Sequence, residues 1–295
     1  MSSPRQRLGE NVSITRSNIW HSDGTVVLQA NTTHQTNLLS KAAPSSSFLD
    51  TVMDVQYLLT VLYDPTFLVQ TALPLPAIGA LIRMGRKYDF ANIFKSAVRR
   101  LTLEYPATLE DYDSTLALDA YTHVPTRIIP YRGMIFDIIS LARENNILSV
   151  LPSAYYHSIV NGLDDVLDGI LRDDGTLAFL APVDQHRCIR GREKLLNVQL
   201  QPGYSIGWYR SWKPGHDCTG GQCTTLIDAR LRDHLNRPLM RALAKFHLNS
   251  SLNNNWCATC KQNIHKLNVA ARKKTWDELP VFFDLPPWNE LTNDL

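Results

Sequence analysis

The fold of this chain is decided by three adjoining segments, DVQYLLTVLYDP (residues 54–65), AIGALIRMGRKYDF (77–90) and ANIFKSAVRRL (91–101). Apolar residues at helical spacing predict an amphipathic helix in each segment. The stripe of the second segment consists of Ile78, Leu81, Ile82 and Gly85. The stripe of the third consists of Ile93, Phe94, Ala97, Val98 and Leu101. We therefore predict a compact cluster of three helices, in which no residue pattern is typical of reaction chemistry.

The composition is that of a globular protein, with 44% hydrophobic and 20% charged residues over 295 residues. A net charge of +2 argues against nucleic acid or an anionic membrane as a bulk partner. No apolar run reaches the roughly 18 residues of a membrane span, and no apolar core follows the N-terminal charges as in a secretory signal. Five cysteines, an odd number, fit a reducing compartment. We expect a soluble intracellular protein, cytoplasmic or nuclear, with no membrane partner.

Outside the helical cluster, the predicted elements are a strand over residues 25–30, a loop over 31–47 and further helices. An apolar stripe on Leu163, Val166, Leu167, Ile170 and Leu171 precedes a turn at 173–175. A helix is predicted over 181–200, with Cys188 inward, and another from about Thr224 through Leu226, Leu231 and Leu235. The C-terminal Pro286-Pro287-Trp288 is expected to dock as an apolar cap. The predicted class is α+β, mostly α, with a small residual sheet.

The helical cluster resembles the C-terminal half of a BTB/POZ domain. The strand over 25–30, after Asp23-Gly24, is similar to the opening strand of that domain. The remainder resembles the C-terminal region of the BTB proteins of mushroom-forming fungi. This second resemblance rests on the motifs Asp173-Asp174-Gly175-Thr176, Cys188, Gly191-Arg192-Glu193, two cysteine pairs, Trp276-Asp277-Glu278-Leu279-Pro280 and Leu285-Pro286-Pro287-Trp288.

The resemblance implies a protein-interaction protein, an adaptor or oligomerisation module, with protein partners, a homodimer and, by analogy, a cullin-type ubiquitin ligase scaffold. The chain departs from the family between the first strand and the first long helix. Where the family has a strand, a His-containing turn and two helices, this chain has only residues 31–50. Since that region builds much of the family's dimer surface, its shortness argues against homodimerisation.

The predicted organisation has four parts. Residues 1–18 form a polar tail, and residues 19–105 form a truncated BTB/POZ-like domain. A connecting segment over 106–130 leads to a helical C-terminal domain over 131–295, which contains the cysteine pairs.

The only cluster of residues with ligand spacing is Cys218-x4-Cys223 with Cys257-x2-Cys260. Two short thiolate pairs separated in sequence are typical of tetrahedral zinc sites, and Gly220-Gly221 would let the chain turn tightly around a metal. His216 and His265 are spare ligands. The alternative is four reduced thiols without metal. Cys188 lies on an apolar stripe and is interpreted as a core residue.

Lys261, Lys266, Arg272, Lys273 and Lys274 lie in a stretch without acidic residues, between Trp256 and Trp276. Beside a zinc site, such a stretch would fit a nucleic-acid-binding or transcriptional regulator, which is our alternative function. A solvated helix face is the commoner cause of such a pattern, and we favour it.

No catalytic or cofactor-binding residues are predicted. The sequence has no glycine-rich phosphate loop, Gly-x-Ser-x-Gly motif or His-Glu-x-x-His motif. Paired acids such as Glu110-Asp111, Asp164-Asp165 and Asp173-Asp174 fall where helix caps and turns are expected. We therefore predict a protein that is not an enzyme.

Overall fold

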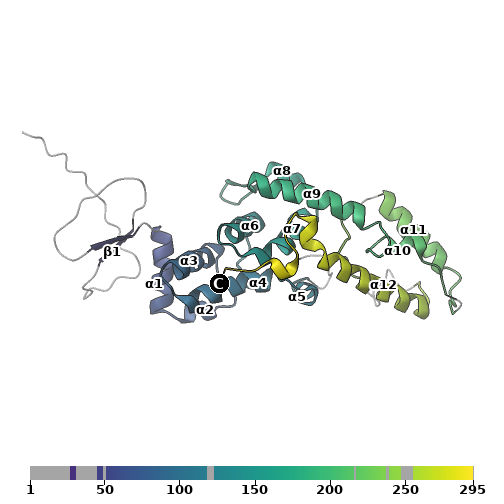
Figure 1. The fold of residues 1–295 in the computed structure, drawn as a ribbon, viewed down its shortest axis with the longest axis horizontal. Coiled ribbons are helices and arrows are strands. Elements are labelled where there is room, and N and C mark those ends of the chain that lie inside the picture. The colour runs from purple at the N-terminus through teal and green to yellow at the C-terminus, as the bar shows by residue number, and fades with distance from the viewer. Residues whose placement is uncertain are drawn as a thin grey trace, which may run out of the picture. The chain divides into compact units, whose positions relative to one another are not determined.

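The computed structural model describes residues 27–30, 45–48, 51–117, 123–215, 217–236, 239–246 and 255–294. The chain forms two compact units, Met1–Gln70 and Thr71–Leu295. Helices dominate the described residues, and the strands among them are short (Figure 1). This confirms the predicted class, α+β and mostly α. No helix among these residues is both long and apolar enough to cross a membrane.

The first unit contains a parallel pair of strands and two helices. Strand β1 (Val27–Ala30) pairs with β2 (Ser45–Phe48), so that Val27 lies opposite Ser45 and Ala30 opposite Phe48. The predicted loop over 31–47 is therefore partly wrong, because Ser45–Phe48 has a strand partner that local sequence does not reveal. The predicted tail over 1–18 lies outside the described residues. Helices α1 (Val52–Tyr63) and α2 (Thr66–Val69) follow.

Helix α1 begins at a side-chain cap. The Thr51 hydroxyl accepts a hydrogen bond from the backbone N–H of Asp54 at 3.1 Å, which satisfies one of the N–H groups that a helix start leaves without a partner. The helix predicted over this segment is thus confirmed.

The second unit begins with two packed helices, α3 (Leu75–Lys87) and α4 (Ala91–Glu104). Both predicted apolar stripes are buried. A Cβ atom on Gly85 would lie 2.9 Å from the Phe94 Cβ, so the missing side chain lets the start of α4 approach α3 closely.

A connection over residues 123–131 leads from α5 (Leu109–Ser114) to α6 (Met134–Glu144) and is fastened to the end of α4. The buried carboxylate of Glu104 accepts hydrogen bonds from the backbone N–H groups of Thr126 and Arg127. Burial disfavours the charged form of Glu104, but these bonds and one to His123 hold its pKa below the ordinary value. Backbone donors of an irregular segment are thereby satisfied.

The centre of the second unit consists of helices that pack around α7 (Leu151–Ile159), which directly follows the short helix η1 (Leu148–Val150). Three helices pack on α7, namely α6, α9 (Pro182–Val198) and α13 (Leu279–Phe282). The expected C-terminal cap is confirmed for Trp288, in helix η3 (Trp288–Glu290), which stacks on Trp276 with 5.4 Å between ring centroids, whereas Pro286 and Pro287 are exposed. The Trp288 indole N–H also donates to the Trp276 carbonyl oxygen at 2.7 Å.

The predicted apolar stripe over 163–171 does not form a buried helical face. The chain instead folds into a short helix, α8 (Asp164–Asp168), and a hairpin of β3 (Ile170–Leu171) and β4 (Leu177–Ala178). Val166 is buried, whereas Leu167 and Leu171 are exposed. Helix α8 ends at Gly169, which has a φ of 83°. This backbone conformation is costly for residues with a side chain, so glycine suits the position.

The remaining helices are α10 (Trp208–Ser211), α11 (Cys223–Asn236) and α12 (Ala258–Asp277). In Figure 1, α10 and α11 lie at one end of this unit, and α12 extends from that end towards α7. The two compact units divide between Gln70 and Thr71, rather than at the expected boundary between residues 105 and 106. Helices α3 and α4 belong to the larger unit because they pack on each other and α3 also packs on α6.

Candidate metal centre

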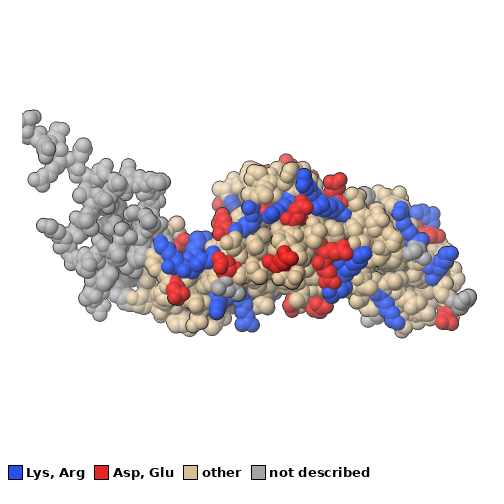
Figure 2. All heavy atoms as spheres, in the orientation of Figure 1, with Lys and Arg blue, Asp and Glu red and all other residues tan. Residues whose placement is uncertain are grey.

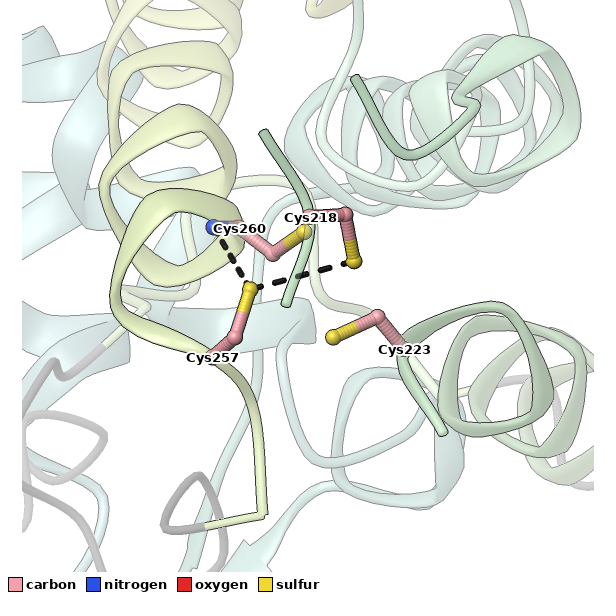
Figure 3. A group of neighbouring side chains, drawn as sticks. All are labelled: Cys218, Cys223, Cys257 and Cys260. Carbon is pink, nitrogen blue, oxygen red and sulfur yellow. Dashed lines mark hydrogen bonds between the residues drawn. The ribbon is translucent and has the colours of Figure 1, made fainter. Parts of the chain in front are cut away.

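Four cysteines from two distant segments meet at one point in the second unit. Cys218 lies in the coil before α11, and Cys223 is the first residue of α11. Cys257 is the N-cap of α12, and Cys260 lies in the first turn of that helix. The four sulfur atoms lie within 4.8 Å of one another (Figure 3). These residues could therefore hold a metal ion, as the spacing of the two pairs predicted.

The N-terminus of α12 favours a thiolate at Cys257. The backbone N–H of Cys260 donates to the Cys257 Sγ at 3.4 Å, and this bond is the main cause that lowers the Cys257 pKa to about 6. Burial raises the pKa of Cys223 and of Cys260. The Cys257 Sγ lies 3.9 Å from the Cys218 Sγ.

Apolar side chains surround the cysteine cluster. Cys223 and Cys260 are themselves members of a buried apolar core. The other members of this core are Trp208, Ile227, Trp256, Ile264 and Ala271. Trp212 packs at its edge, edge-on to Trp256 with 6.1 Å between ring centroids. An apolar shell of this kind limits access of water and strengthens the attraction between thiolates and a cation, although Cys218 and Cys257 are only partly buried.

Gly220 supports the cluster in a different way from the predicted one. Gly220 and Gly221 are not among the glycines with positive φ, so no left-handed turn is involved. A Cβ atom on Gly220 would lie 3.1 Å from the Cys223 Sγ and 3.2 Å from the Cys257 Cβ. The missing side chain thus leaves room beside the sulfur atoms.

The spare ligands that the sequence suggested do not join the cluster among the described residues. His265 lies on α12, where its Nδ1 is 3.4 Å from the Phe246 carbonyl oxygen, and it is not part of the group of possible ligands. His216 lies outside the described residues. Cys188 is fully buried on α9 with its Sγ 3.3 Å from the Ser158 hydroxyl, which confirms its interpretation as a core residue.

Sequence reasoning missed the apolar residues that complete the site. Ile227 follows Cys223 by four positions, and Ile264 follows Cys260 by four, so each pair lies on one helical face. This periodicity could have identified them. The helix predicted from about Thr224 is confirmed as α11, in which Cys223 and Ile227 are buried and Leu235 is exposed. The contribution of Trp208 has no local signal.

Most of the basic residues of α12 contact acidic or aromatic side chains of the second unit. Arg272 is buried and forms a bidentate pair with Asp113, in which Nη1 donates to Oδ2 at 3.1 Å. Lys273 pairs with Asp277, and the Lys274 ammonium lies 4.1 Å from the centroid of the Tyr204 ring. Only two of the five cations, Lys261 and Lys266, have no such partner within the described part of the chain.

The paired acids occupy helix starts and turns, as predicted. Glu110 and Asp111 lie in the first turn of α5, where the Thr108 hydroxyl accepts from the Asp111 N–H at 3.2 Å. In the β3–β4 turn, the Asp174 carboxylate accepts from the Thr176 N–H at 2.9 Å. These contacts give the acids local structural roles.

Comparisons with known proteins add no family: no family model matches the chain, and neither curated proteins nor solved structures give a match.

Proposed function

We propose that this chain is a non-enzymatic protein-interaction protein in which a structural zinc ion, bound by Cys218, Cys223, Cys257 and Cys260, joins α11 to α12. The observation that carries the proposal is the convergence of four sulfur atoms within 4.8 Å. In a tetrahedral thiolate site with Zn–S bonds of about 2.3 Å, the sulfur atoms are about 3.8 Å apart. The 3.9 Å between Cys218 and Cys257 fits this spacing.

The positions of the cysteines also suit a structural role. Cys223 and Cys257 stand at the starts of α11 and α12, where the helix dipole favours negative charge. Four thiolates leave no position for a substrate or a reactive water, which is typical of structural rather than catalytic zinc. The ion would connect two segments that otherwise meet through a small apolar core, since the described residues contain no disulfide.

An interaction function is favoured over nucleic-acid binding because of what the basic residues contact. Arg272, Lys273 and Lys274 each face an acidic or aromatic partner inside the second unit. A phosphate-binding surface needs cations that are free to replace counterions. The predicted BTB/POZ-type adaptor role, the homodimer and the cullin-type scaffold remain proposals that rest on the resemblance alone.

The zinc centre is tested by metal analysis of the purified full chain. We expect one zinc per chain for the wild type and for Cys188→Ser, a matched control because Cys188 is the one cysteine outside the cluster. Cys257→Ser and Cys260→Ser should each lose most of the zinc. A wild-type protein without stoichiometric zinc, or equal loss in the Cys188 variant, contradicts the proposal.

The choice between protein and nucleic acid is tested by binding to duplex DNA and to single-stranded RNA at increasing salt. We expect no binding that weakens steeply with salt. A clear salt-dependent affinity that Lys261→Ala and Lys266→Ala reduce would instead support the nucleic-acid-binding regulator.

A further inference from the structure

The β3–β4 hairpin exposes an apolar face where a sheet of this kind is ordinarily polar. Leu171 lies opposite Leu177 in the antiparallel register, and Phe179 follows Leu177 by two positions on the same face. Their exposed fractions are 51%, 48% and 52%. In a sheet with one solvated face, the outer positions are expected to be polar.

The opposite face of the hairpin is already covered. Ala178 is buried, and a Cβ atom on Gly133, at the start of α6, would lie 2.8 Å from the Ala178 Cβ. The hairpin therefore packs on α6 through its inner face, and its orientation leaves the three large apolar side chains outside. A slip of one residue would reverse the two faces, so the exposure of these residues follows directly from the register.

Further exposed apolar side chains lie close to this face in the sequence, on the helices that precede and follow the hairpin. The Phe179 ring lies against Gly169. A Cβ atom added to Gly169 would lie 2.7 Å from the Phe179 Cε1. Leu167 on α8 and Val183 in the first turn of α9 are also exposed. In the space-filling view, charged side chains are scattered over the part of the surface where α8 and α9 lie, with uncharged surface between them (Figure 2). We define the hairpin patch as Leu167, Leu171, Leu177, Phe179 and Val183.

The charged residues of the segment that forms the patch are almost all acidic. Between residues 164 and 183 the chain has five aspartates and one basic residue. The aspartates, all exposed, are Asp164, Asp165, Asp168, Asp173 and Asp174. The basic residue, Arg172, is paired with Asp137 at 2.6 Å. On the adjoining α9, Arg190 and Lys194 face Asp284.

From this combination we infer that the hairpin patch binds a protein segment in which apolar residues are flanked by Lys or Arg, such as a basic amphipathic helix. The apolar side chains would cover the patch, and the cations would meet the surrounding aspartates. A second copy of this chain is a poorer occupant, because a two-fold contact would bring two acidic rims together. The inference deepens the proposed interaction function and rests on it.

The test uses the full, zinc-loaded chain and three labelled synthetic peptides in fluorescence anisotropy. The first peptide has a Leu/Phe face and Lys on its other faces. The second has Glu in place of each Lys, and the third has the composition of the first in an order without an apolar face. We expect saturable binding of the first peptide alone, and weaker binding at higher salt.

Matched variants locate the binding. Leu171→Ser with Leu177→Ser should weaken it by about tenfold, and Asp168→Asn with Asp173→Asn by several-fold. The controls are Leu235→Ser with Val281→Ser, at comparably exposed positions (50% and 55%), and Asp228→Asn with Asp233→Asn on α11. Both controls should leave binding unchanged, and all variants should keep the wild-type thermal midpoint, because the substituted side chains are exposed.

Three outcomes overturn the inference. They are absence of saturable binding to the first peptide, equal binding of the Glu peptide, or equal losses in patch and control variants. If sedimentation shows a wild-type dimer that Leu171→Ser with Leu177→Ser dissociates, the patch binds a second copy instead. Zinc content, measured on the same samples, separates failure of this inference from failure of the proposed metal centre.

Discussion

At the scale of single residues, the absence of a side chain at Gly191 controls the contact between α9 and α13. A Cβ atom there would lie 2.3 Å from two atoms of the Phe283 ring, which is fully buried. A contact this short forces either the ring or a helix to move. Gly191 was part of a sequence motif, but the ring that packs on it comes from a distant segment.

We predict that Gly191→Ala lowers the free energy of unfolding by about 1–3 kcal/mol. Urea denaturation of the purified protein measures this. Gly215→Ala is the control, because no atom of the described residues, chain neighbours aside, lies within 4 Å of its added Cβ, and its effect should stay within about 0.5 kcal/mol. Equal effects of the two substitutions would contradict the packing explanation.

A second residue-scale feature is the buried imidazole of His157 on α7. Its ring lies near those of Tyr105, Tyr112 and His123, the last at 4.6 Å between centroids. Its Nε2 is buried and has no hydrogen-bond partner among the residues that the structure describes. Burial, with a smaller contribution from His123, lowers its pKa well below the ordinary value of 6.5. The folded protein therefore holds this ring neutral.

The sign of the resulting pH dependence follows from proton binding. Below about pH 6.5 the unfolded chain binds a proton at His157 that the folded chain does not, so stability falls as the pH falls. The slope is at most about 1.4 kcal/mol per pH unit for one proton. We predict that His157→Leu flattens the decline between about pH 6.5 and pH 5 in urea unfolding. The exposed His186→Gln should keep the wild-type slope; the same slope in both variants would contradict this assignment.

At the scale of elements, the starts of α11 and α12 depend on the cysteine cluster. If zinc joins them, removing it leaves only a small apolar core between the two helices. We predict that a chelator reduces amide-hydrogen protection in α11 and the first half of α12, while α3, α4 and α7 keep theirs. Hydrogen exchange with mass spectrometry measures both regions in one sample. Unchanged protection in α11 after complete zinc removal would contradict a structural role.

Elements also differ in how well their sequence predicted them. The stripes of α3 and α4 were predicted correctly because each helix is long and its apolar residues share one face. The segment over 163–171 has a similar pattern but contains Gly169, which ends α8 with a positive φ of 83°. Leu171 then falls on the outer face of the hairpin and Leu167 on an exposed side of α8, whereas Val166 is buried.

At the scale of the molecule, an ion pair connects helices that are far apart in the sequence. Arg272 on α12 is buried and donates two hydrogen bonds to the carboxylate of Asp113 on α5, and Lys245 lies 3.2 Å from the same carboxylate. The Arg272 Nε also donates to the Leu243 carbonyl oxygen at 2.8 Å. Removing the carboxylate would leave a buried guanidinium without its counterion.

We predict that Asp113→Ala lowers the free energy of unfolding by roughly 3 kcal/mol. Asp277→Ala is the matched control, since Asp277 also pairs with a cation of α12 but lies exposed on the same helix. Its effect should stay within about 0.5 kcal/mol. Chemical denaturation of both variants compares them; a small loss for Asp113→Ala would show that Arg272 is satisfied without its carboxylate.

The division into two compact units makes a further prediction at this scale. A fragment that begins at Thr71 contains all of the second unit, so we expect it to fold and unfold in a single cooperative transition. Far-UV circular dichroism and thermal unfolding of residues 71–295 measure this. A fragment without a cooperative transition would show that the second unit needs residues 1–70.

The sequence by itself determined the helical class, the faces of α3 and α4, the buried Cys188 and the pairs of cysteines, because local periodicity and ligand spacing specify them. Only the tertiary structure decided that the two cysteine pairs meet, that Arg272 turns inward to Asp113, and that Leu171 and Leu177 face outward. Each of these depends on partners far away in the chain. Local sequence records what a side chain can do, whereas packing decides which surface is covered and which charge is neutralised.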